Sequence, residues 1–82
     1  MAGEREDACT KASMFANGAM KARQSGMLLS EAMENSMDDK AVRHIIAEAY
    51  KFPLAESKEE KEKSINEFQN HIYLDCYKAF GG

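Results

Sequence analysis

Apolar residues recur along this chain at steps of three and four, and nowhere do they alternate with polar residues as in a β-strand. One proline and five glycines interrupt the 82 residues. A chain of this length forms one domain, and its core is thin because such a domain buries only about 60% of its unfolded surface. The sequence therefore predicts a single all-α domain over residues 1–82, built as a small bundle of three longer helices plus one short helix.

The first long helix is expected over residues 5–24, followed by Gly26 in a left-handed C-cap. Its predicted apolar face consists of Ala8, Cys9, Ala12, Ala16, Ala19 and Arg23, with Phe15 and Met20 on the flanks. A short helix should follow, with Ser30 as its N-cap and its end near Asn35.

The third predicted helix can be capped by Asp38. Its apolar stripe consists of Val42, Ile45, Ile46 and Ala49, with Tyr50 and Phe52 near its end. Pro53 prevents this helix from continuing, because proline lacks the backbone N–H that a helix interior needs.

The clearest local signal in the chain is a Ser-x-x-Glu capping box formed by Ser57 and Glu60. The last long helix should follow it over residues 58–79. Its predicted inner face consists of Ile65, Phe68, Ile72, Cys76 and either Ala79 or Phe80. The run over residues 56–63 is charged on all sides, so we interpret it as a solvated helix start.

The two cysteines lie on the apolar faces of the first and last helices. Cys9 is near the start of one and Cys76 near the end of the other, so they meet if the two helices pack antiparallel. A disulfide there would stabilise the fold by about 4 kcal/mol in the loop-entropy description. The alternative is two buried free thiols in a reducing cytosol. A bridge favours an oxidising compartment, such as a periplasm or the cell exterior.

Metal-binding and catalytic patterns are weak. The soft or borderline metal ligands are Cys9, His44, His71 and Cys76. His71 and Cys76 lie roughly 140° apart around a helix, so they cannot easily face one metal. A Cys76–His44 pair lacks a glycine-rich turn for an oxyanion hole, and His71 with Glu67 and Asp75 is typical of surface pairing. The sequence predicts no metal site, no cofactor and no enzymatic activity.

Charge and hydropathy exclude two further classes of partner. The net charge of −3 argues against nucleic acid, whose phosphates need a basic stripe. No apolar run approaches the roughly 20 residues that cross a bilayer. Residues 1–7 lack the apolar region of a signal peptide, so the protein is either cytoplasmic or a secreted chain whose signal peptide has been removed.

Methionines are the feature that most favours a binding function. Five fall in the first half of the chain: Met14, Met20, Met27, Met33 and Met37. Flexible thioethers line adaptable grooves in some helical proteins, although we expect most of these to fill gaps in a small core. The group Met27, Leu28, Leu29 and Met33 surrounds a loop and a short helix with little area to bury it. We expect it to be partly exposed and to bind a protein partner or a second copy in a two-fold dimer.

Several short segments occur in an order that is similar to a group of small exported proteins of phages and prophages in bacteria. The matching pieces are Cys9, Arg23-Gln24-Ser25-Gly26, Leu29-Ser30, Ala49-Tyr50-Lys51-Phe52-Pro53, Glu67-Phe68 and Tyr73-Leu74-Asp75-Cys76-Tyr77-Lys78. They run across nearly the whole chain. The resemblance implies an all-helical fold, the Cys9–Cys76 bridge and export, but it implies no activity. Arg23 and Tyr50 stand out within it, and we expect Arg23 to pair with Glu48 or Asp75.

Three functions follow as hypotheses. The first is a non-enzymatic periplasmic or secreted module that binds a host envelope protein. The second is a cytoplasmic phage-type inhibitor that docks its acidic surface on a host defence complex. The third is a structural component that works only as an oligomer. The redox state of the cysteines separates the first from the second, and the solution mass separates the third from both.

Overall fold

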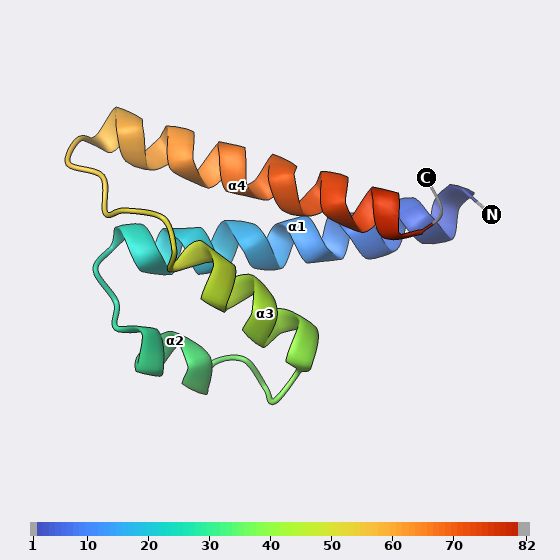
Figure 1. Cartoon of the computed structure of the whole chain (residues 1–82), viewed down its shortest axis with the longest axis horizontal. Coiled ribbons are helices and arrows are strands. Elements are labelled where there is room, and N and C mark those ends of the chain that lie inside the picture. The colour runs from blue at the N-terminus through green and yellow to red at the C-terminus, as the bar shows by residue number, and fades with distance from the viewer. Residues whose placement is uncertain (1, 81–82) are drawn as a thin grey trace.

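The computed structural model describes residues 2–80, and these residues form four helices and no strand. The helices are α1 (Ala2–Gln24), α2 (Leu29–Glu34), α3 (Lys40–Ala49) and α4 (Lys58–Ala79). Figure 1 shows α1 and α4 side by side along the long axis, with α3 and α2 together on one side of α1. The all-helical prediction is confirmed. None of the helices described is long and apolar enough to cross a membrane.

The two long helices run antiparallel and are joined by the predicted disulfide (Figure 1). Cys9 on α1 and Cys76 on α4 have Cα atoms 5.4 Å apart, within the range of ordinary disulfides. Cys9 is fully buried, which confirms its place on the inner face of α1. The alternative of two free thiols is therefore excluded.

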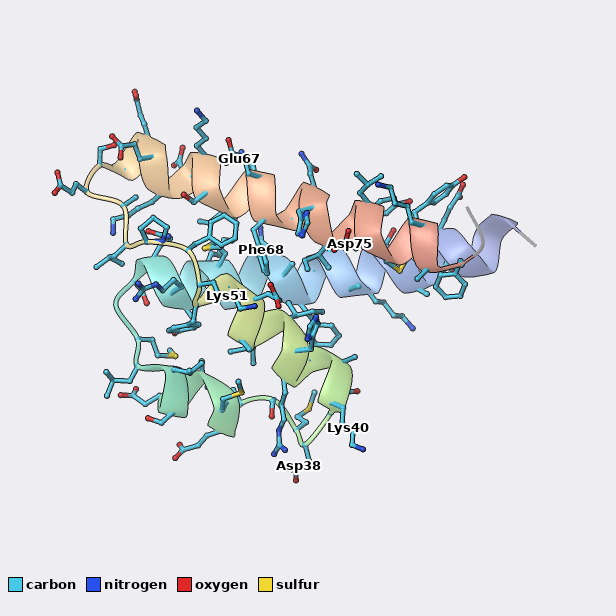
Figure 2. All side chains as sticks on the ribbon, viewed as in Figure 1. Asp38, Lys40, Lys51, Glu67, Phe68 and Asp75 are labelled. Atoms are coloured by element: carbon cyan, nitrogen blue, oxygen red, sulfur yellow. A yellow bond between two sulfur atoms is a disulfide. The ribbon has the colours of Figure 1, made fainter. Side chains whose placement is uncertain are left out.

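The core lies where α1 meets α4 and α3. Its buried apolar side chains are Ala16, Ala19, Met20, Ala32, Val42, Ile45, Ile46, Ala49, Phe68 and Ile72. Small alanines on α1 let the other helices approach closely, and the largest buried side chain, Phe68, fills the space between α4 and α1 (Figure 2). Phe52 packs on Phe68 edge to face, with ring centroids 5.4 Å apart. The predicted stripe of α3 is confirmed in full.

The end of α1 holds the connection between α3 and α4. Gln24 is only 4% exposed, and its side chain donates to the Pro53 carbonyl at 3.1 Å and accepts from the Ala55 N–H at 2.8 Å. The Gln24 carbonyl accepts from the Lys61 ammonium at 2.7 Å. Buried polar groups left unpaired are costly, so these bonds fix the path of the loop. Lys61 is thus an exception to the solvated start expected for α4.

The C-terminal end of α1 and the start of α4 follow the predictions, whereas α1 begins at Ala2, earlier than the expected start at residue 5. Gly26 has φ of +88°, the left-handed conformation of a helix C-cap. The Ser57 hydroxyl accepts from the Glu60 N–H at 3.1 Å, and α4 begins at the next residue. The inner face of α4 ends earlier than expected, because Phe80 is half exposed and Ala79 is also exposed.

Two predicted N-caps are wrong by one or two residues. Helix α2 begins at Leu29, so Ser30 lies inside its first turn and Leu28 holds the cap position without a side-chain bond. Helix α3 is capped by Asp39, whose carboxylate accepts from the N–H groups of Ala41 and Val42 at 2.8 and 3.2 Å. Asp38 cannot serve, because its φ of 59° is left-handed whereas an N-cap needs extended backbone.

Candidate partner-binding groove

The described residues contain an apolar groove of about 300 Å³ framed by α1, α2 and α3. Small residues make its floor: Gly18, Ala19 and Ala22 from α1, with Ala32 from α2. Larger side chains, Met14, Phe15 and Met27, line the same groove. Met14 is 65% exposed and Phe15 43% exposed, so two large apolar side chains lie open to solvent here.

Gly18 sits in the middle of a long helix, where glycine costs about 1 kcal/mol relative to alanine. Glycine is often needed where a neighbouring helix leaves no room for a side chain. A Cβ built on Gly18 meets nothing within 4 Å, so no such neighbour exists among the described residues. The fold itself therefore does not require the glycine, and its missing side chain keeps the groove open.

The structure divides the four residues predicted to bind a partner. Leu28 and Leu29 are 63% and 42% exposed, as expected of a surface patch. Met27 and Met33 are only partly exposed and pack against the core. Met27 also lines the groove, so it links the Leu28–Leu29 surface to the floor formed by α1.

Sequence reasoning missed the α1 side of the site. Phe15 was expected on the flank of an inner face and Met14 as core filler, yet both are exposed at the groove. The sequence signal that could have indicated this side of the site is Gly18, a glycine in a helix interior between Phe15 and Ala22. Of the other methionines, Met20 is buried as expected, whereas Met37 is 78% exposed in a left-handed turn with φ of 54°.

Charged side chains of both signs lie near the groove. Lys11 borders the apolar hollow at Met14 and Phe15. Glu31 lies on α2 at the other end, where its carbonyl accepts from the side chain of groove-lining Asn35 at 3.3 Å. Asp38 is paired with Arg43 beyond α2, and Figure 2 shows Asp38 pointing away from the bundle.

A polar link holds the loop after α1 against α3. The Tyr50 hydroxyl donates to the Met27 carbonyl at 2.7 Å, and burial raises the pKa of Tyr50 above its ordinary value. The expected ion pair of Arg23 with Glu48 or Asp75 is wrong. Arg23 instead donates to the Phe52 carbonyl at 3.0 Å and lies over the Tyr50 ring, 5.5 Å from its centroid. A backbone carbonyl cannot be identified as a partner from side-chain patterns.

The histidines and carboxylates form surface pairs. His71 lies 3.2 Å from Asp75 on α4, as expected, and both are exposed. Glu48 accepts from Lys51 at 2.9 Å, and this bond, aided by His44, lowers the pKa of Glu48. Within residues 2–80, no three His, Cys, Asp or Glu side chains are grouped to hold a metal ion. The absence of a cofactor stays a prediction.

No family model, no curated protein and no solved structure matches the chain. The similarity to exported phage proteins therefore stays a prediction.

Proposed function

We propose that this protein is a non-enzymatic binding module and that the groove over Gly18 receives a segment of a protein partner. The observation that carries the proposal is the groove's construction. Small residues form its floor, Met14 and Met27 are among its lining residues, and its central glycine has no steric role within the described fold. Flexible methionine side chains suit a surface that adapts to another chain. An exposed apolar groove often marks a site where another protein binds.

The partner we propose is a bacterial envelope protein, met after export of this chain. The Cys9–Cys76 disulfide supports an oxidising compartment, where such bonds persist. The similarity to exported phage and prophage proteins supports the same setting. The acidic balance of the chain is compatible with a protein partner and unsuited to nucleic acid.

Filling the groove tests the proposal without damaging the core. Gly18→Leu puts a side chain into the hollow at a site where no atom blocks the Cβ, and leucine is a better helix former than glycine. We expect the variant to unfold at a higher denaturant concentration than wild type and to lose partner capture. Capture is measured by crosslinking from bacterial envelope fractions, with identification of the captured protein.

Gly18→Ala is the matched control, because it removes the glycine and leaves most of the groove open. It should raise the free energy of unfolding by about 0.5–1 kcal/mol and retain capture. A second pair of substitutions, Met14→Asp with Leu28→Asp, alters only exposed side chains and should also abolish capture. If Gly18→Leu captures the same partner as wild type, the groove is not the binding site.

A further inference from the structure

We infer that the Cys9–Cys76 disulfide is a redox switch for one end of the molecule, and that reduction by a dithiol opens this end without unfolding the rest. The end consists of residues 2–11 of α1 and residues 73–80 at the end of α4, and we call it the distal end. Figure 1 shows α2 and α3 beside the C-terminal half of α1, so among the described residues only α1 and α4 meet there. The switch is separate from the proposed function, because no residue that lines the groove belongs to the distal end.

The hydrophobic core stops before it reaches the distal end. On α1 the core begins at Ala16, with Ala12 packed against it, and on α4 it ends at Ile72. Among the side chains whose burial the structure describes, Cys9 is the only buried apolar one before Ala16, and there is none after Ile72. The disulfide therefore lies beyond the packed core of the long pair.

The large apolar side chains that follow Ile72 lie at the surface instead. Leu74, Tyr77 and Phe80 are 50%, 41% and 50% exposed, so their contacts bury only part of each side chain. Most of the stability of a helix in a protein comes from packing of its apolar face, and segments with few buried apolar contacts open locally at low free energy. Without the disulfide, both segments of the distal end should therefore open while the core stays folded.

Reduction requires a dithiol that can reach one of the two sulfur atoms. Cys9 is fully buried whereas Cys76 is partly exposed, so the attacking thiolate reaches the Cys76 sulfur. The S–S bond breaks as a mixed disulfide forms on Cys76, and the Cys9 sulfur leaves as a thiolate that takes up a proton. The second thiol of the reductant then closes a disulfide within the reductant and releases Cys76 as a thiol. Two electrons and two protons thus pass from the dithiol to the bridge.

The test is NMR of the full chain with and without dithiothreitol. After reduction, the Cα chemical shifts of both distal segments should lose at least about half of their helical displacement from random-coil values. The shifts over α3, and over residues 16–24 of α1, should stay helical. The variant Cys9→Ala with Cys76→Ala should show the reduced pattern without dithiothreitol and should not respond to it.

A matched control separates the bridge from stability in general. Gln24→Leu weakens the opposite end of the long pair and keeps the disulfide, so its distal end should stay helical. Proteolysis gives a second measurement, because chymotrypsin cleaves after large apolar residues in locally unfolded segments. In the double alanine variant, cuts after Leu74 or Tyr77 should precede any cut after Phe68, whereas oxidised wild type should resist cleavage at all three.

Three results would overturn the inference. Helical shifts that persist throughout the distal end after reduction would show that the bridge does not hold it. Loss of helical shifts in α3 as well would show that the disulfide controls the whole fold rather than one end. Opening of the distal end in Gln24→Leu would show that the opening follows any loss of stability. None of these results decides the proposed function, which the capture experiment with Gly18→Leu tests.

Discussion

The α1–α4 pair and the α2–α3 region are built in different ways. A disulfide joins α1 to α4 near one end of the pair, and Gln24 fixes the loop that enters α4 at the other. The α2–α3 region instead contains two left-handed non-glycine residues, Met37 and Asp38, and exposes Leu28, Leu29 and Met37. The long pair therefore supplies most of the constraint, and the shorter helices supply an apolar surface.

The largest expected effect comes from removing the disulfide. Cys9→Ala with Cys76→Ala should lower the free energy of unfolding by about 4 kcal/mol, because the unfolded chain is no longer constrained over a separation of 67 residues. Urea unfolding followed by circular dichroism measures this difference. A loss below about 1 kcal/mol would show that packing alone holds the long pair together.

A smaller loss is expected at the opposite end of the pair. Gln24→Leu leaves the Ala55 N–H and the Pro53 carbonyl without their partner, which should cost about 2 kcal/mol. Asn17→Ala is the comparison on the same helix. It removes a partly buried bond to Gln69 of 2.9 Å and should cost less than about 1 kcal/mol. Equal losses in the two variants would contradict a special role for Gln24.

The start of α4 and the start of α2 should also differ in how much a serine contributes to stability. Ser57→Ala removes the bond to the Glu60 N–H and should cost about 1 kcal/mol in denaturant titration. Ser30→Ala should be close to neutral, because Ser30 lies inside the first turn of α2 and does not cap it. A cost at Ser30 as large as that at Ser57 would place the start of α2 one or two residues later.

The smallest effect concerns alkaline pH. Burial raises the pKa of Tyr50 above its ordinary value of 10.0, so the folded protein retains this proton when the unfolded chain loses it. The stabilisation is complete below pH 10.0 and is lost as the pH rises through the folded pKa. Melting temperatures between pH 8 and 11 should fall more for wild type than for Tyr50→Phe. Parallel curves would show that the Tyr50 hydroxyl does not couple to folding.

Local signals in the sequence predicted the long helices well. The N-cap at Ser57, the C-cap at Gly26 and the stripe of α3 depend on neighbouring residues alone, and all three are confirmed. Prediction of the disulfide required more than local signals, because it combined the apolar faces of two helices with the assumption that these helices pack antiparallel.

Features that depend on tertiary contacts could not be predicted in the same way. The turn before α3 places Asp38 in left-handed backbone, and Arg43 binds both Asp38 and the buried Ser36. That arrangement makes Asp39 the cap. The exposure of Met14 and Phe15 depends on where α2 and α3 lie across α1, which helical periodicity does not specify.

The Cys9–Cys76 bond also determines how the molecule responds to mechanical force. Tension applied to the chain before Cys9 and after Cys76 passes through the sulfur atoms and bypasses the residues between them. The helical packing inside this covalent loop therefore carries none of the applied force while the disulfide is intact. Reduction of the bond transfers the load to the α1–α4 contact, and unfolding then releases about 230 Å of extended chain. Force spectroscopy with and without reductant measures this release of chain, which should appear as one extension step in the reduced protein only.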